Sequence, residues 1–379
     1  MDSPLISRSA NLRCAQEEVI KHFLFRFVAV LICLLIVALF AELALRTLVP
    51  GGGKPLSERR IFCRFDQELG WAPLESVTQA DKENQFFVHQ NQFGLRAPDD
   101  IQLKRTSTRK RVLVLGDSYV WGLGASQNEL FTNRSVYRTD DELINCGVSG
   151  YGTDQEYLFY LRVGQRFDVD QVVLVFTPHN DVANNLASKQ YSYLKPYFTL
   201  NNGELILHAD HVRNNPVRNL IRRVDRECRV WNVVTKGLQG LGHAIVPKKE
   251  KLKDAQRNFL VSDADRAGIE LTLALIKKLK EAVAARGAEL YVVFIPFNKR
   301  IDKNLPDNHP FVPLIASGLT QMGVSYREPY PEFLKAAMAG EKLFHPPDNH
   351  FSAAGHALFA KFVTDTELAR ASTDYYAHQ

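Results

Sequence analysis

The chain has 379 residues, of which 45% are apolar and 23% charged, a composition that is typical of a folded protein and excludes a disordered one. Its formal net charge of +5 is small for this length, and the sequence contains no RNA- or DNA-binding motif, so nucleic-acid binding is excluded as a function. The length is sufficient for one large globular domain with appendages.

An apolar stretch near the N-terminus predicts a membrane anchor. Residues Phe27 to Ala41 carry no charge, and the surrounding stretch 23–49 is long enough to cross a bilayer as a helix. A cleaved signal peptide is one alternative, but the charged segment before the apolar core is long and no convincing cleavage site follows it. A buried core helix is the other, and the Pro/Gly-rich exit at 49–54 favours an isolated membrane span over it.

Basic residues lie on both sides of this anchor, so the positive-inside rule does not fix its orientation. They are Arg8, Arg13 and Lys21 before it, and Arg46, Lys54, Arg59 and Arg60 after it. We expect residues 1–22 to be cytoplasmic and the large domain to be extracytoplasmic, because one N-terminal anchor before a large domain is the usual export arrangement. In a bacterium that domain would lie in the periplasm.

The rest of the chain divides into a tether and a domain. Residues 50–109 are polar and irregular, and we expect them to lead into the domain without carrying chemistry. From residue 110 to 379, short β-rich runs alternate with helical patterns, which predicts an α/β fold with a parallel sheet covered by helices on both faces. The predicted strands are Val112–Leu115, Leu143–Cys146, Val172–Phe176 and Leu290–Ile295.

Two of the intervening helices have explicit start signals. Thr153 and Glu156 form a capping-box pattern, and Ser262 and Asp265 form a similar one. Apolar residues follow Ser262 at helical spacing, and Arg286-Gly287 supplies a stop before the last predicted strand. These signals predict βα units.

Between about residues 185 and 260 the alternation breaks, which we interpret as an insertion. It contains a predicted hairpin around Asn201-Asn202-Gly203 and a basic amphipathic helix over 215–231. The basic face either is solvated or rests on anionic lipid or an acidic glycan. The aromatic residues of the insertion either contact glycan or belong to the core; among them are Tyr191, Tyr193, Tyr197 and Phe198.

The first predicted strand ends in Gly116-Asp117-Ser118, a turn that can present one hydroxyl. Ser118 would then lie at the N-terminus of a following helix, where free backbone N–H groups and the helix dipole favour an alkoxide or oxyanion. Ser118 is therefore a candidate nucleophile. Such turns also end ordinary strands, so the tripeptide alone does not decide between the two interpretations.

Two further polar turns follow the next predicted strands, at the sheet edge where open α/β sheets bind ligands. Residues 145–152 form a glycine-rich turn whose backbone can approach a bound group closely, and the Asn180 side-chain amide after the third strand can donate a hydrogen bond to an oxyanion. Without a ligand, the first is a tight βα turn and the second a loop with a helix cap.

A histidine-containing loop precedes an Ala-rich helical pattern that Ser352 can cap. Imidazole can remove the serine proton near neutral pH, and a nearby carboxylate can fix its tautomer. His350 and Asp348 are the candidates for these roles. The spacing of His345, His350 and His356 also allows metal ligation, but no recognisable zinc pattern is present, and we expect no metal or cofactor.

Taken in chain order, Gly-Asp-Ser, Asn-x-Gly-x-x-Gly, His-Asn-Asp and Asp-x-His resemble the motif blocks of the SGNH (GDSL-type) hydrolase family over residues 110 to about 370. The resemblance implies an α/β/α sandwich on a parallel sheet. It also implies that Ser118 is the nucleophile, that His350 is the base, and that Gly150, Asn180 and the Ser118 N–H form the oxyanion hole. Many members carry the acid three residues before the histidine, where this chain has Pro347, so Asp348 departs from the pattern.

The expected activity is a membrane-anchored serine esterase or O-acyl transferase that works through an acyl-enzyme. Its substrate would be an acylated glycan or another ester, and the resemblance to polysaccharide-modifying members suggests a membrane-bound acyltransferase partner. The alternative is a non-catalytic carbohydrate-binding or polysaccharide-assembly protein on the same fold, which would bind without turnover. A structural domain with fortuitous motifs is the third reading.

Overall fold

The structure is a computed structural model that describes residues 4–48, 58–81, 86–133, 140–191, 193–213, 228, 230–231, 233–234, 261–345 and 349–364. Its contacts divide the chain into two compact units. The first comprises Met1–Pro55 and Leu220–Lys251, and the second comprises Leu56–Asn219 and Leu252–Gln379.

The first unit is built on one long helix, α1 (Pro4–Leu48). Within its section Ile20–Leu45, an 18-residue window has a mean hydropathy of 3.0 and is not buried against the protein, which makes the section a candidate single membrane span. The section coincides with most of the predicted anchor. Near its end, the Glu42 carboxylate accepts a hydrogen bond of 2.8 Å from the backbone N–H of Val230.

The second unit is organised around a sheet of five parallel strands in the spatial order β13-β12-β7-β5-β6. Four of them coincide with the predicted strands, and the short edge strand β13 was not predicted. The five strands are β5 (Arg111–Gly116), β6 (Glu142–Gly147), β7 (Gln171–Phe176), β12 (Glu289–Phe294) and β13 (Ser325–Arg327).

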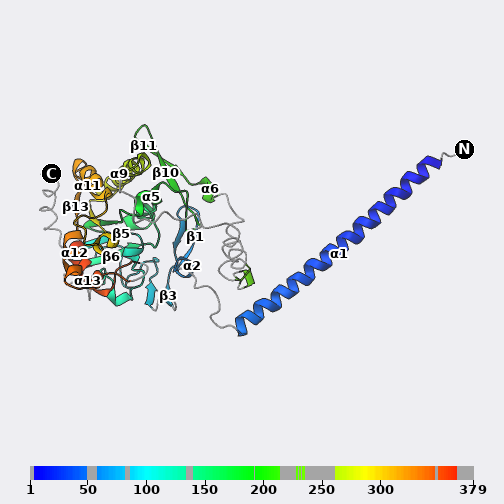
Figure 1. Cartoon of the computed structure of the whole chain (residues 1–379), viewed down its shortest axis with the longest axis horizontal. Coiled ribbons are helices and arrows are strands. Elements are labelled where there is room, and N and C mark those ends of the chain that lie inside the picture. Colours follow the sequence, from blue (N-terminus) through cyan, green and yellow to red (C-terminus); the bar gives the residue numbers. More distant parts are fainter. Residues whose placement is uncertain are drawn as a thin grey trace. The chain divides into compact units, whose positions relative to one another are not determined.

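Successive strand residues face opposite sides of this sheet, and both sides are covered by helices (Figure 1). Leu113 and Leu115 belong to the core under α4 (Thr153–Arg162), α9 (Asp263–Ala284) and α11 (Phe311–Gln321). Val112 and Val114 belong to the core under α12 (Tyr330–Met338) and α13 (Ala353–Thr364). The predicted three-layer α/β fold is confirmed.

The strand order places a topological switch point between β5 and β7. From β5, the chain moves first to its neighbour β6 on one side, and all later strands are added on the other side. Helices on opposite faces then diverge at the carboxyl ends of β5 and β7, which is where open α/β sheets bind their ligands.

Smaller elements surround this framework as four antiparallel pairs and several single-turn helices. The pairs are β1 (Cys63–Asp66) with β2 (Gly70–Pro73), β3 (Val77–Asp81) with β4 (Phe86–Gln90), β8 (Lys189–Gln190) with β9 (Tyr193–Leu194), and β10 (Tyr197–Asn201) with β11 (Glu204–His208). The single-turn helices are α2 (Glu58–Phe62), α3 (Ser118–Trp121), η1 (Gln127–Glu129), η2 (Gly164–Arg166), α5 (Asp181–Asn185), α6 (Asp210–Arg213) and α10 (Asn298–Ile301).

Several local predictions can be compared with these elements. The Ser262 capping box is confirmed, since its hydroxyl accepts from the Asp265 N–H at 3.2 Å. The turn between β10 and β11 is confirmed as Asn202-Gly203, both at positive φ. The predicted helix stop at Arg286-Gly287 is confirmed, since α9 ends at Ala284 and Gly287 has a φ of 77°. Most of the predicted amphipathic helix 215–231 lies outside the described residues.

The predicted capping box at Thr153 is wrong. Helix α4 begins one residue earlier, with Gly152 as its N-cap, and Thr153 is its first helical residue. Its free N–H groups are satisfied by other side chains: the Asp154 N–H donates to Asn185 Oδ1 at 3.1 Å, and the Gln155 N–H donates to Asp154 Oδ1 at 2.8 Å.

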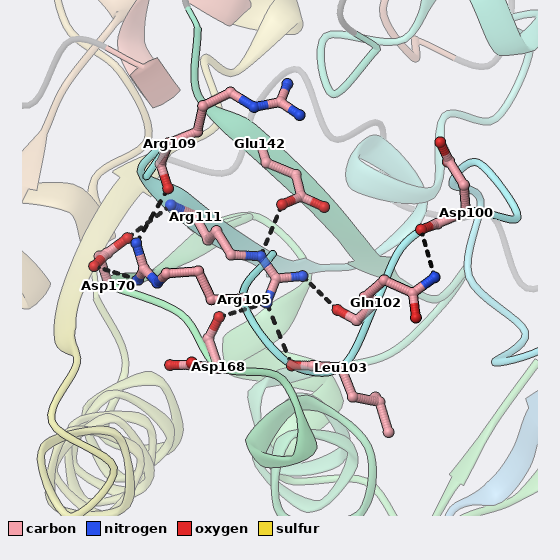
Figure 2. Close-up of polar contacts among 9 residues, drawn as sticks. All are labelled: Asp100, Gln102, Leu103, Arg105, Arg109, Arg111, Glu142, Asp168 and Asp170. Carbon is pink, nitrogen blue, oxygen red and sulfur yellow. Dashed lines mark hydrogen bonds and ion pairs between the residues drawn. The ribbon is translucent and has the colours of Figure 1, made fainter. Parts of the chain in front are cut away.

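A buried arginine holds the amino ends of neighbouring strands, opposite the end of the sheet where the polar turns lie (Figure 2). Arg111 is 1% exposed at the start of β5, and its Nε donates to Glu142 Oε2 at 2.8 Å. Its Nη1 donates to the Asp168 carbonyl at 2.6 Å, and its backbone N–H donates to Asp170 Oδ2 at 2.8 Å. Because these partners precede or open the strands β6 and β7, Arg111 ties three neighbouring strands together.

Candidate active site

Ser118 lies at the carboxyl end of β5, where the strand turns sharply into α3. Asp117 is the N-cap of this helix, and its carboxylate accepts a hydrogen bond of 2.9 Å from the Tyr119 N–H. Gly122, at a φ of 83°, ends the helix after a single turn. The Gly-Asp-Ser turn therefore holds one serine hydroxyl at the edge of the sheet.

A second buried arginine fastens the other end of α3. Arg96 is 1% exposed, and its Nη1 donates to the carbonyls of Trp121 and Gly122 at 2.9 and 2.7 Å. Its Nη2 donates to the Ala125 carbonyl at 2.9 Å. Burial lowers the pKa of Arg96 to about 9. These contacts satisfy the carbonyl end of the helix that carries Ser118.

The structure brings His350 to Ser118. The distance between His350 Nε2 and Ser118 Oγ is 2.7 Å, a hydrogen-bonding distance. The imidazole is held from one side by the Tyr119 ring, whose centroid lies 4.8 Å from that of His350. With the serine hydroxyl as donor, this is the geometry in which a neutral imidazole can accept the serine proton.

The loop that carries His350 is closed by backbone contacts. The His345 N–H donates to the His350 carbonyl at 2.8 Å, and Phe344 and Phe351 form an antiparallel bridge. After the loop, the Ser352 hydroxyl accepts from the Gly355 N–H at 3.1 Å and caps α13 as predicted. The helix and the bridge fix the two ends of this loop.

The remaining residues of the histidine loop have different positions. Asp348, the predicted acid, lies outside the described residues, so its role stays a prediction. His356 is 1% exposed and stacks on Phe131, with ring centroids 5.7 Å apart, and burial lowers its pKa to about 3. His356 is thus a core residue. Within the described part of the chain, no cluster of His, Cys, Asp and Glu side chains could hold a metal ion.

The two predicted oxyanion donors follow the neighbouring strands. Gly150 lies in the turn after β6 at a φ of 79°, a conformation that favours glycine. Asn180 lies in the loop after β7, and its Nδ2 donates to Asp117 Oδ2 at 2.9 Å. This bond uses one of the two amide N–H groups. Among the described residues, the backbone N–H groups of Ser118 and Gly150 donate no hydrogen bond.

Residues upstream of the predicted domain hold the Gly150 turn. Ser149 Oγ donates to Glu58 Oε1 at 2.6 Å and accepts from Arg59 Nη1 at 3.1 Å. The Trp71 indole N–H donates to the Ser149 carbonyl at 3.1 Å. The segment that we expected to carry no chemistry therefore forms part of the site, and no local sequence signal marks these residues.

Buried carboxyl groups lie behind the site. Glu156 is 1% exposed, and its pKa is raised well above the ordinary value by burial and by the neighbouring acids Asp117 and Asp154. Burial and the same group of acids also raise the pKa of Asp181 well above its ordinary value. Asp154 is paired with the fully buried Lys195. Burial and these like charges therefore favour the neutral form of the Glu156 carboxyl group.

Comparisons with known proteins find distant structural matches only. No protein-family model matches the sequence, and no curated protein matches it. A solved structure of a protein named TesA is 12% identical, with a TM-score of 0.36, and the match covers 68% of this chain and 99% of TesA. A protein from Streptococcus pneumonia, provisionally described as a platelet activating factor, is 13% identical, with a TM-score of 0.35 and coverages of 69% and 85%.

Proposed function

We propose that this protein is a serine-dependent ester hydrolase or O-acyl transferase that works through an acyl-enzyme. The observation that carries this proposal is the 2.7 Å contact between His350 Nε2 and Ser118 Oγ at the switch point of a parallel sheet. The ordered motif blocks that resemble the SGNH hydrolases support the same chemistry.

In the first step, Ser118 Oγ attacks the ester carbonyl carbon while His350 Nε2 accepts the hydroxyl proton. The carbonyl oxygen becomes an oxyanion, which the N–H groups of Ser118 and Gly150 and the second amide N–H of Asn180 stabilise. The tetrahedral intermediate collapses, the C–O bond to the alcohol breaks, and His350 returns the proton to the leaving oxygen. The products of this step are a free alcohol and acyl-Ser118.

In the second step, His350 removes a proton from the acceptor, whose oxygen attacks the acyl carbonyl carbon. The bond from this carbon to Ser118 Oγ then breaks, and His350 returns the proton to Ser118 Oγ. Water as acceptor makes the protein a hydrolase, and a sugar hydroxyl makes it an O-acyl transferase. We propose an acylated glycan as substrate and a single-pass anchor that keeps the domain at the outer face of a membrane, where a membrane-bound acyltransferase could supply acyl groups. Asp348 is the proposed acid that orients His350.

Trapping the acyl-enzyme tests this proposal. The full-length protein in detergent is mixed with an isotopically labelled O-acetylated oligosaccharide, quenched in acid and analysed by mass spectrometry of the peptide that contains Ser118. We expect acetyl on Ser118 and none in Ser118→Ala. Folded protein that binds the oligosaccharide but never carries acetyl would contradict the proposal and favour a carbohydrate-binding protein. Adding unlabelled oligosaccharide as acceptor then measures how acetyl divides between water and sugar.

A further inference from the structure

Tyr191 occupies a backbone position that does not favour tyrosine. It lies in the two-residue connection between β8 and β9, at a φ of 48°. Short hairpin turns at positive φ favour Asn, Asp or Gly, and a bulky residue there is a strained outlier. Such strain persists where the surroundings hold the residue in place, often at ligand sites. The local fold therefore gives no reason for an aromatic ring at this position.

One face of the Tyr191 ring is covered by a fixed cation. The Arg59 guanidinium carbon lies 3.8 Å from the ring centroid. Arg59 is itself held, because its Nη1 donates to Glu58 Oε1 at 2.6 Å and to Ser149 Oγ at 3.1 Å. The Arg59 side chain is 11% exposed and Tyr191 is 45% exposed. The stack thus presents a fixed aromatic ring to solvent.

The same ring touches the glycine that we assign to the oxyanion hole. A methyl group built on Gly150 would lie 2.7 Å from Tyr191 Cε2 and 2.9 Å from Arg59 Nη1. Burial is the main cause that raises the pKa of the Tyr191 hydroxyl, Arg59 opposes it, and the Asp117 carboxylate adds to it. Tyr191 therefore packs against the Gly150 turn.

Three other aromatic residues of the insertion, Tyr193, Tyr197 and Phe198, pack on residues other than Gly150. Tyr193 packs on Trp71 with ring centroids 5.7 Å apart, and Tyr197 stacks on His208 at 4.8 Å. Phe198 is 6% exposed in a core with Leu271 and Leu275. Of these four aromatic side chains, only Tyr191 combines an exposed ring with contact to the candidate active site.

We propose that Tyr191 determines substrate specificity by stacking on the sugar ring that carries the scissile ester, and that Arg59 is the residue that positions Tyr191. This inference rests on the proposed esterase or acyl-transfer function. A pyranose ring has a face of C–H groups, and burying this face on an aromatic ring makes the free energy of binding more favourable. Ligand sites combine such apolar walls with a few polar groups. A small alkyl ester would reach Ser118 without using this stack.

The test compares two esters in the full-length protein in detergent. Consumption of an O-acetylated oligosaccharide and of ethyl acetate is measured for the native chain, Tyr191→Asn and Tyr191→Phe. Asn suits the left-handed turn better than Tyr, so Tyr191→Asn is expected to fold at least as well. We expect its kcat/KM to fall at least tenfold for the sugar ester and to change less than twofold for ethyl acetate, while Tyr191→Phe keeps both values.

Substitutions of Arg59 test the second part of the proposal, and a substitution of Tyr197 is the control. Arg59→Met removes the planar cation and also the hydrogen bond to Ser149 Oγ in the Gly150 turn, so kcat/KM is expected to fall more for the sugar ester than for ethyl acetate, with partial rescue in Arg59→Lys. Tyr197→Ala, in the same insertion, is expected to leave both esters unchanged. If Tyr191→Asn changes kcat/KM by the same factor for the two esters, or changes it for neither, while Ser118 is still acylated, the inference is overturned and the proposed function stands. If neither ester acylates Ser118 in the native chain, the proposed function itself fails.

Discussion

The residue after the candidate nucleophile is hydrogen-bonded to the residue before the candidate base: the Tyr119 hydroxyl donates to the Asn349 carbonyl at 2.9 Å. Asn349 has a φ of 66°, so the loop bends sharply where it delivers the imidazole. The tyrosine ring also packs against the imidazole, 4.8 Å between centroids. Tyr119 thus links the serine turn to the histidine loop across most of the chain.

Tyr119→Phe removes this hydrogen bond and keeps the ring contact. A neutral hydrogen bond contributes about 1 kcal/mol, so we expect kcat to fall by about fivefold to tenfold. KM and the melting temperature are expected to change little, because the loop retains its backbone contacts. Steady-state kinetics with ethyl acetate measures the effect. An unchanged kcat would show that Tyr119 does not position His350.

Gly150→Ala tests the turn that we assign to the oxyanion hole. Alanine at a φ of 79° is strained, and its methyl group would lie 2.7 Å from the Tyr191 ring. Displacement of the backbone N–H from the oxyanion is expected to lower kcat by about a hundredfold or more. Gly203→Ala, at a φ of 83° in open space, is the matched control for backbone strain alone. Equal effects of the two substitutions on kcat would contradict the assignment.

Arg96 and Arg111 are buried arginines at opposite ends of the β5–α3 unit. Substituting each of them distinguishes residues that hold the active site from residues that only stabilise the fold. Leaving buried carbonyl or carboxylate partners unpaired costs about 3 kcal/mol, so we expect Arg96→Met and Arg111→Met to lower the free energy of unfolding by similar amounts. Urea titration measures this loss.

Only Arg96→Met is expected to slow the reaction of Ser118 per folded molecule, because only Arg96 holds the nucleophile helix. Loss of reactivity in both variants to the same extent would show that the effect follows stability alone.

Glu156→Gln tests the buried carboxyl group behind the site. The pKa of Glu156 is raised above its ordinary value of 4.5, mainly by burial. A raised folded-state pKa gives a stability contribution that is complete below the unfolded-state pKa and is lost as the pH rises through the folded-state pKa. The native chain is therefore expected to lose up to about 1.4 kcal/mol per pH unit in that window relative to Glu156→Gln.

Melting temperatures of both chains between pH 5 and pH 9 measure this effect. We expect the melting temperature of Glu156→Gln to rise relative to that of the native chain as the pH increases. Parallel curves for the two chains would mean that Glu156 is ionised at neutral pH.

Much of the framework follows from local patterns in the sequence. Buried strands such as 112–115 are short runs of Val and Leu that leave no polar face, and the Ser262 cap is a local hydrogen bond between residues three apart. Ser118 and His350 were identified because each lies in a motif at the end of a regular element. Strand β13 has only three residues, too few for a periodic pattern, so it was not predicted.

The missed features depend on contacts between distant segments. Thr153 matches a capping pattern, but Asn185 reaches across to the start of α4 and makes a threonine cap unnecessary. Arg59 lies in a polar stretch, and Tyr191 lies in a turn without the usual Asn or Gly signal. Their positions against Gly150 depend on how the upstream segment and the insertion pack on the sheet, which no local pattern indicates.

The most direct test of the central claim is fluorophosphonate labelling of the full-length protein in detergent, read by mass spectrometry at Ser118. Ser118→Ala and His350→Ala are labelled in parallel, and circular dichroism confirms that each is folded. We predict stoichiometric labelling of Ser118 in the native chain and a loss of labelling in His350→Ala, because the imidazole activates the hydroxyl. A folded native chain that is not labelled, or labelling that persists unchanged in His350→Ala, would contradict the account.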